Sequence, residues 1–417
     1  MLLGAGVSAC SGAPAPVASG PRPNIVLVTI ETTRADHVGP LYGHEQPTFP
    51  KLSARAASGM VYTRAFSASS WTLPSIVSIY TGLSPLQHTV DRIERQVPEL
   101  DRPLLGHALE SRGYEVAFFG VNPVFSVDRG LAADRAHWQP EVGWPAGRLN
   151  QAVIAWLDQR KTPQQPLFLH VHYFDPHCPY IPPDRALAQV SPPSVSPGTV
   201  PSERFAEMGG CYGIDKADGS PELELSTYHH RYDAELRAVD ESLDRLLVRL
   251  AERGIGGPSD LLVVTSDHGE AFWEHDDYGH SHTLWGETTW VPLVVWGAGQ
   301  GRSTEPVSLT GLYGSLLAAA GLAATPTLAE SRSFSQGTEA GGSPWKAWVS
   351  DGQKWMTDGE HAWTTDVRAD PLDSRPAEAA MALPAELQAV LDKAVTPVPL
   401  QPTDEERERL RALDYTL

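Results

Sequence analysis

Five short apolar segments recur along the chain and are rich in β-branched and aromatic residues. They occupy residues 24–30, 115–120, 167–172, 261–266 and 291–296. Runs of this length that are apolar at nearly every position are typical of strands buried on both faces of a parallel sheet. The pattern therefore predicts a central sheet whose strands are far apart in the sequence.

Stretches with helical periodicity separate these strands. Residues 232–253 place apolar side chains three and four positions apart, which predicts a long amphipathic helix, and residues 76–82 are also expected to be helical. This alternation of strands and helices predicts an α/β fold, an α/β/α sandwich with a mostly parallel central sheet.

The pattern changes in two places, which divide the chain into expected domains. Residues 185–223 are rich in Pro, Ser and Gly and predict a surface insertion in an α/β domain of residues 24–335. After residue 335, alternating positions near 347–357 and 361–367 predict a small antiparallel sheet. Two short helices, the second ending in the charged segment 404–412, are expected to complete a C-terminal subdomain of residues 336–417.

The N-terminus indicates export. Residues 1–9 are small and apolar, and the small residues before Cys10 resemble a bacterial lipobox, in which the cysteine becomes the lipidated first residue. Residues 11–23 form a tether of Ser, Ala, Pro and Gly. We therefore expect an exported protein, either a lipoprotein of the bacterial cell envelope or a periplasmic or extracellular protein. A terminal segment without any such role is the alternative.

Composition narrows the range of partners. The chain has 417 residues, with 51 Asp and Glu against 32 Lys and Arg, and a formal net charge of −19. This charge argues against sequence-independent binding to nucleic acid or to an anionic lipid surface. No apolar run is long enough to span a bilayer, so membrane contact is expected only through a lipid anchor at Cys10. Cys178 and Cys211 remain as a disulfide pair in an oxidising compartment, or as free buried thiols.

Candidate chemistry lies where the predicted strands end, because ligands of open α/β sheets bind beyond the carboxyl ends of the strands. Glu31 follows the first strand, Asp175 and His177 follow the third, and Asp267 and His268 follow the fourth. Converging carboxylates and imidazoles are ligands for a divalent cation such as Ca²⁺, Mg²⁺, Mn²⁺ or Zn²⁺. The alternative for each residue is capping of the helix or turn that follows it.

Thr72 lies close to the helix expected at 76–82. Pro74 suits the first turn of a helix, where its missing N–H has no partner to lose. Thr72 is then either a helix N-cap, which the spacing alone favours, or a nucleophile held over a helix N-terminus. Oriented N–H groups at such a terminus also favour a sulfate or phosphate group.

Six segments, in order, resemble the successive blocks of the sulfatase family, which belongs to the alkaline-phosphatase superfamily of metallohydrolases. They are PNIVLVTIETTRADHVG, WTLPSIVSIYTGLSP, HVHYFDPHCPY, YDAELRAVDESLDRLL, VVTSDHGEAFWEHDDYGHSHTLW and DEERERLRALDY. The resemblance spans residues 22–417 and implies an α/β/α core with a small C-terminal sheet-and-helix subdomain. It also implies hydrolysis of sulfate or phosphate esters with one divalent metal ion, and leaves a second ion open.

The resemblance further implies roles for single residues. Glu31 matches the first metal-binding carboxylate of the family, and Asp267 and His268 match the later pair of ligands. Thr72 takes the place of the nucleophile, which also lies against the metal. His177 matches a histidine that contacts the substrate near the leaving group.

Other polar residues near these blocks have open roles. His280 stands where relatives carry a basic substrate-binding residue, and we count it with Thr72 and His177 as catalytic. His282 is a spare ligand, a second basic contact or part of a surface loop. A second ion would draw its ligands from four residues, namely Asp175, His177, His280 and His282. Structural or solvated roles are expected for two pairs, the ion pair Arg34–Asp36 and the exposed His229 and His230.

The chain also departs from the family pattern. Active sulfatases oxidise a Cys or Ser followed by x-Pro-x-Arg to formylglycine, whereas this chain has Thr72 at the nucleophile position and Ile76 in place of the arginine. Thr72 cannot become formylglycine by that route, and threonine nucleophiles in the superfamily accompany phosphoryl chemistry. Glu31 replaces an aspartate, and Thr32 stands where many sulfatases have a second acidic ligand. These changes weaken the expected metal site.

Three functions remain open at this point. The first is a metal-dependent hydrolase of sulfate or phosphate esters, with small molecules, glycans or lipid headgroups as the substrate class. The second is a phosphodiesterase or a phosphoglycerol- or phosphoethanolamine-type transferase. The third is a cell-envelope lipoprotein that keeps the fold and binds a glycan or protein without catalysis.

Overall fold

The computed structural model describes residues 22–125, 136–138, 144–194, 197–205, 208, 212–329, 334–337, 345–393, 395–404 and 407–408. Residues 1–21 of the predicted leader and tether (1–23), with Cys10, lie outside these residues. So do Cys211 and most of the segment 404–412.

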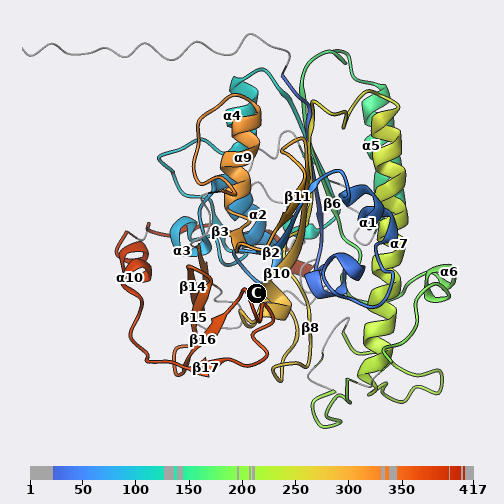
Figure 1. Cartoon of the computed structure of the whole chain (residues 1–417), viewed down its shortest axis with the longest axis vertical. Helices are drawn as coiled ribbons and strands as arrows, with labels where there is room; N and C mark the ends of the chain where they lie inside the picture. The colour runs from blue at the N-terminus through green and yellow to red at the C-terminus, as the bar shows by residue number, and fades with distance from the viewer. Residues whose placement is uncertain are drawn as a thin grey trace, which may run out of the picture.

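A large, mostly parallel sheet forms the middle of the molecule (Figure 1). Its strands run in the order β11-β2-β10-β7-β1-β6-β4-β5, and β12 also pairs with β2. The inner strands β1, β6 and β7 are buried at every position, as expected for strands covered on both faces. The strand bounds are β1 Ile25–Ile30, β2 Met60–Phe66, β4 Glu115–Gly120, β5 Ala136–Trp138, β6 Leu167–Tyr173, β7 Leu261–Ser266, β10 Trp290–Trp296, β11 Gly301–Ser303 and β12 Val307–Ser308.

Helices cover both faces of this sheet. On one face the long helix α7 packs against α1 and α5, and on the other α9 packs against α2 and α4 (Figure 1). Each helical layer buries its own apolar cluster against the sheet. The helices are α1 Pro50–Ala56, α2 Thr72–Thr81, α3 Pro85–His88, α4 Leu105–Ser111, α5 Ala146–Asp158, α6 Asp184–Leu187, α7 Leu225–Ala251, α8 Gly286–Thr289, α9 Gly311–Ala319 and α10 Ala385–Leu391, with the short 3₁₀ turns η1 Ala35–His37, η2 Gly39–Leu41 and η3 Pro123–Phe125.

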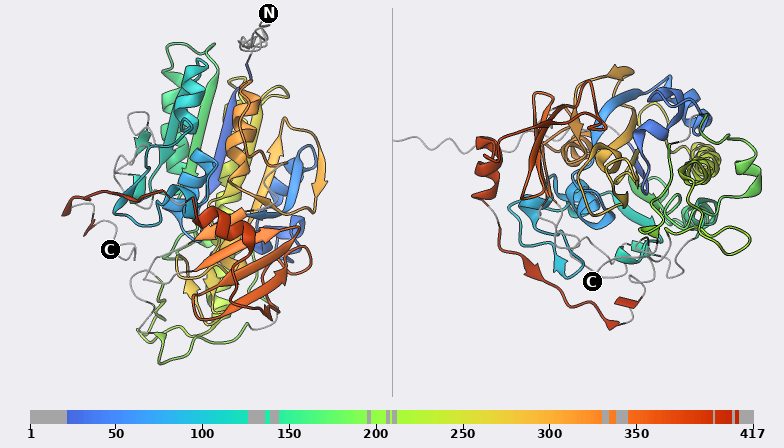
Figure 2. Two further views of the ribbon diagram at one scale, coloured as in Figure 1. Left: turned by 90° about the vertical axis from the view of Figure 1, so that its left-hand side faces the viewer. Right: turned by 90° about the horizontal axis from the view of Figure 1, so that it is seen from below.

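A second, antiparallel sheet in the C-terminal region lies at one end of the sandwich, in orange and red in Figure 2. It has the order β13-β14-β15-β16-β17, and α10 packs beside α3. These strands are β13 Phe334–Gly337, β14 Lys346–Ser350, β15 Gln353–Thr357, β16 Ala362–Asp366 and β17 Ala377–Glu378. Two small ribbons complete the fold, β3 Arg95–Gln96 with β18 Val398–Pro399 and β8 Ala271–Phe272 with β9 Tyr278–Gly279.

The structure confirms the predicted α/β/α sandwich, its five apolar strands and the small antiparallel sheet. Two features were not expected. Strand β2 alternates buried and half-buried positions and joins the sheet beside β10, which is antiparallel to both of its neighbours. The predicted insertion 185–223 packs part of its length into the core, with Val200, Tyr212 and Ile214 buried.

No helix in the described part of the chain combines the length and the apolar character needed to cross a membrane.

Candidate functional site

Strand register brings the first two carboxylates of the site together. Strand β1 lies between β6 and β7, and Ile30 pairs with Tyr173 on one side and Ser266 on the other. The next residues, Glu31 and Asp267, therefore leave the carboxyl edge of the sheet side by side. This is the edge at which open α/β sheets bind their ligands.

Thr72 lies against these residues at the start of α2. Its hydroxyl donates to Glu31 Oε1 at 2.8 Å and lies 3.2 Å from His268 Nε2. The N-cap of α2 is Trp71, and Thr72 is the first helical residue. The interpretation of Thr72 as a helix cap is therefore wrong, because its hydroxyl is engaged across the site rather than with its own helix.

The site residues have the features of a cation-binding group. Glu31, Asp267 and His268 are fully buried and place one ligand atom each within 4.8 Å of one another. Asp267 Oδ2 is buried and accepts no hydrogen bond in the described structure. Burial, and then the adjacent Glu31 carboxylate, raise the pKa of Asp267 to about 7. Two buried carboxylates that disfavour each other's charge fit a divalent cation.

His177 and His280 lie next to this group. The ring centroid of His280 is 4.5 Å from that of His268 and 5.1 Å from that of His177. Both His177 and His280 are buried, and burial lowers the pKa of each imidazole. The structure thus brings together Glu31, Thr72, Asp267, His268, His177 and His280, whose catalytic and ligand roles stay predictions.

The four residues considered for a second ion are not among the groups of close ligand atoms in the described part of the chain. Asp175 accepts a hydrogen bond from the backbone N–H of Ala146 at 2.8 Å, at the start of α5. His282 Nδ1 lies 3.2 Å from Asp277 Oδ1, in a loop where its side chain is 41% exposed. The rings of His177 and His280 are neighbours, and Asp175 lines the same cavity as His177, so the second ion stays a prediction.

Three supporting residues were absent from the sequence prediction of the site. Asn122 Nδ2 donates to Glu31 Oε1 at 2.6 Å. His172 Nε2 lies 3.2 Å from Glu31 Oε2. Glu270 places Oε1 2.9 Å from His280 Nδ1 and accepts the hydroxyl of Tyr180 on Oε2 at 2.9 Å. Asn122 and His172 lie at carboxyl ends of strands, so the rule that located Glu31 also applies to them.

His172 is the last member of a buried chain of hydrogen bonds. Tyr80 contacts His170 Nδ1 at 2.9 Å, His170 Nε2 contacts Thr29 Oγ1 at 2.9 Å, and Thr29 Oγ1 contacts His172 Nδ1 at 2.7 Å. An ionised Glu31 accepts from His172 Nε2–H, which requires the Thr29 hydroxyl to donate to Nδ1. That orientation propagates through His170 to Tyr80, so one consistent set of donors holds Glu31 in place.

Three further expectations concern residues around the site. Arg34 and Asp36 form the expected ion pair at 2.8 Å, and Arg34 also binds the backbone carbonyl of Glu270 at 3.0 Å. Cys178 is buried and disulfide-bonded rather than a free thiol. His229 is buried, so the expectation that it is solvated is wrong.

Comparison with known proteins places the site in a family. The sulfatase family model matches residues 23–322. The multifunctional alkaline phosphatase superfamily protein PehA of Trinickia caryophylli is 24% identical, in an alignment that covers 67% of this chain and 69% of that protein.

Solved structures share the fold over nearly the whole chain. The phosphonate monoester hydrolase of Agrobacterium radiobacter superposes with a TM-score of 0.66 at 19% identity and covers 94% of this chain and 95% of its own. A protein solved in complex with its substrate, D-glucosamine-2-N,6-O-disulfate, superposes with a TM-score of 0.68 at 16% identity and covers 94% of this chain and 98% of its own. Because the family model matches most of the chain, the protein belongs to the sulfatase family, within the alkaline phosphatase superfamily.

Proposed function

We propose that the protein hydrolyses phosphate or sulfate esters and that Thr72 is its nucleophile. The observation that carries this proposal is the hydrogen bond of 2.8 Å from the Thr72 hydroxyl to Glu31 Oε1, in a buried group that also contains Asp267 and His268. A hydroxyl at the start of a helix, held by a carboxylate, has a base in place for its proton.

The residues of the chain have defined roles in the first chemical step. Glu31 takes the proton from Thr72 as the hydroxyl oxygen attacks phosphorus or sulfur, and the bond to the leaving oxygen breaks. His177 gives a proton to that oxygen or stabilises its charge, and the N–H groups at the start of α2 face the anionic ester. The Thr72 ester formed in this step then passes to water, or to an acceptor alcohol in a transferase.

Glu31, Asp267, His268 and Thr72 would hold the divalent metal. When bound, such an ion lowers the pKa of the hydroxyl and screens the charge of the ester. Carboxylate and imidazole ligands suit Mn²⁺, Zn²⁺, Mg²⁺ or Ca²⁺.

Phosphate esters are the preferred substrate class. Threonine cannot supply the hydrated aldehyde by which formylglycine sulfatases release sulfate, so the covalent ester must be resolved by attack of water or of an acceptor alcohol. Ile76, which replaces the family arginine, is buried in the apolar cluster beside α9 and offers no charge to the site. The names of the similar proteins cover both phosphonate and sulfate chemistry.

The test is an assay of the purified protein with Mn²⁺, Zn²⁺ or Ca²⁺ on p-nitrophenyl phosphate, bis-p-nitrophenyl phosphate and p-nitrophenyl sulfate. Thr72→Ala should lower turnover by about 1,000-fold or more and leave metal binding largely intact, because Glu31, Asp267 and His268 remain. Thr81→Ala is the matched control, because it removes the same hydroxyl at the other end of α2. Full turnover by Thr72→Ala would overturn the mechanism.

We also propose that the protein acts outside the cytoplasm, on esters of glycans or lipid headgroups, held by a lipid at Cys10. The disulfide bond of Cys178 supports an oxidising compartment. Cys10→Ser in the full-length chain should move the protein from the membrane fraction to the soluble fraction of the producing cell. An unchanged distribution would exclude the anchor.

A further inference from the structure

We propose that His37, His44 and Asp233 form a second metal site, specific for Zn²⁺ and similar transition metals. None of these residues belongs to the group around Glu31. The three offer ligand atoms that all lie within 4.8 Å of one another.

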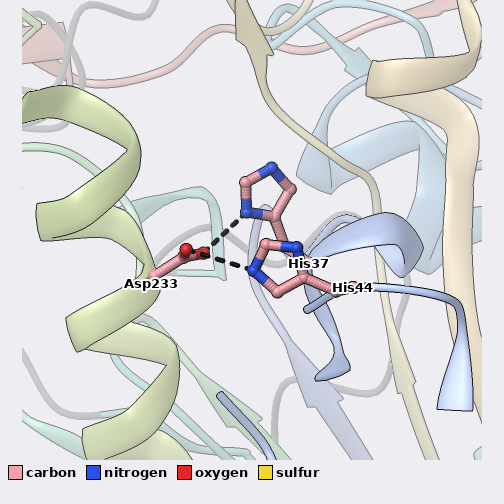
Figure 3. A group of neighbouring side chains, drawn as sticks. All are labelled: His37, His44 and Asp233. Carbon is pink, nitrogen blue, oxygen red and sulfur yellow. Dashed lines mark hydrogen bonds and ion pairs between the residues drawn. The ribbon is translucent and has the colours of Figure 1, made fainter. Parts of the chain in front are cut away.

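Two loops and one helix build this zinc site. His37 ends η1, His44 lies three residues after η2, and Asp233 lies on α7. His37 Nδ1 is 2.6 Å from Asp233 Oδ1, and His44 Nε2 is 3.1 Å from Asp233 Oδ2. Figure 3 shows both imidazoles, from the blue N-terminal segment, each directing a nitrogen at the carboxylate on the green helix.

The surrounding structure holds these side chains in position. Asp233 and His37 are buried, and His44 is partly buried. The ring of His229 stacks on that of His37, with centroids 5.3 Å apart. Thr48 donates its hydroxyl to the backbone carbonyl of His37. A ligand set that is already oriented loses little conformational entropy when an ion binds.

A cavity of about 560 Å³ opens beside the site and is lined in part by all three residues. The charged residues that line the cavity are mostly acidic. They are Asp36, Glu45, Asp233 and Asp370, with the cationic Arg64. An ion bound by three protein groups would have its remaining coordination position toward this cavity, where water can enter.

The donor set decides the metal. Two imidazole nitrogens and one carboxylate form a common zinc arrangement, whereas Ca²⁺ takes six to eight oxygen ligands. The catalytic group has two carboxylates and one imidazole, so the two sites differ in preference. Because His37 and His44 belong to the N-terminal segment and Asp233 to α7, an ion here would tie these parts of the fold together.

The test uses a background in which the catalytic ligands are removed, Glu31→Gln with Asp267→Asn. This protein is dialysed against Zn²⁺ with excess Ca²⁺, and its zinc content and melting temperature are measured. We expect one equivalent of zinc and a higher melting temperature than in the zinc-free sample. Adding His44→Ala should abolish both, whereas the matched control His230→Ala, on α7, should keep both.

Two results would overturn the proposal. One is the absence of zinc in the background protein, and the other is an unchanged zinc content after His44→Ala. Circular dichroism shows whether each variant is folded, and His44→Gln replaces His44→Ala if the latter is not. In the otherwise wild-type chain, His44→Ala should leave ester hydrolysis unchanged, so this test is independent of the proposed catalytic function.

Discussion

At the scale of single residues, the candidate site depends on how Glu31 is held. Its Oε1 accepts from Thr72 and Asn122, and its Oε2 faces His172. The side chain of glutamate is longer than that of aspartate and can adopt more orientations. Three donors hold this carboxylate in one of them. The glutamate is therefore compatible with a precise site.

His172→Phe tests this support. The phenyl ring keeps most of the volume of imidazole but removes the N–H that faces Glu31 Oε2. We expect kcat/KM and metal affinity each to fall by about 10- to 100-fold, as for other partners of metal ligands. His172→Gln, which retains an N–H donor, should recover part of both. Equal losses in the two variants would indicate a purely steric role.

Glu235 gives a prediction for the pH dependence of stability. Burial, with a contribution from Asp175, raises the pKa of Glu235 from 4.5 to about 8. The folded state therefore binds the proton more tightly than the unfolded state, and the free energy of unfolding should fall as pH rises from about 4.5 through about 8.

Glu235→Gln should flatten this part of the stability curve and make the variant more stable than wild type above about pH 8. Urea unfolding at several pH values is the measurement. Parallel curves for the two proteins would show that Glu235 does not titrate in this range.

At the scale of elements, α1 is capped by another helix. Phe49, at the N-cap position, makes no capping hydrogen bond with its side chain. Instead, Asp240 on α7 accepts hydrogen bonds from the backbone N–H groups of Lys51 at 2.9 Å and Leu52 at 2.8 Å. The carboxylate serves two of the unsatisfied donors at the start of α1. It also fixes α1 against α7 in the layer that covers one face of the sheet.

Asp240→Ala should lower the free energy of unfolding by about 0.5–2 kcal/mol, the usual cost of losing a cap. Asp240→Asn keeps one acceptor oxygen and should cost less. Urea denaturation of the three proteins measures this order, and a more stable Asp240→Ala variant would contradict the capping role.

Most strands of the large sheet could be predicted from the sequence, and their burial explains which strands could be predicted and which could not. Strands β1, β6, β7 and β10 are predicted by nearly continuous apolar runs because both faces of each are covered, and β4 is a similar run although part of it is half-buried. Strand β2 escapes that signal because alternate positions are only half-buried.

Part of the candidate site could also be predicted from the sequence. Residues that directly follow a strand, such as Glu31 and Asp267, were found from the sequence. The support from Asn122 and His172 depends on which strands are neighbours, and periodicity does not reveal that order.

At the scale of the whole molecule, one buried lysine joins the two sheets. Lys354, on β15, donates from Nζ to Asp373 Oδ2 and to the backbone carbonyl of Leu284, both at 2.6 Å. Leu284 lies in the loop before α8, which leads into strand β10 of the large sheet. The lysine is 1% exposed and Asp373 is fully buried.

Lys354→Met should lower the free energy of unfolding by about 3–5 kcal/mol, because it leaves the Asp373 carboxylate buried without its cation. Arg249→Met is the control, since its partner Glu252 is about half exposed and its loss should cost less than about 1 kcal/mol. Chemical denaturation of both variants compares the costs. Similar costs would show that the buried pair contributes no more than a surface one.

The strand order also determines when during synthesis the sheet can form. Strand β1 pairs with β6 and β7, and β2, which precedes Thr72, pairs with β10, β11 and β12. On the ribosome, β1 has neither of these partners until β6 ends at residue 173, and β2 has none of its partners until β10 ends at residue 296. The proposed nucleophile is thus made early but is anchored late, so the nascent chain must keep these two apolar strands from aggregating while most of the protein is translated.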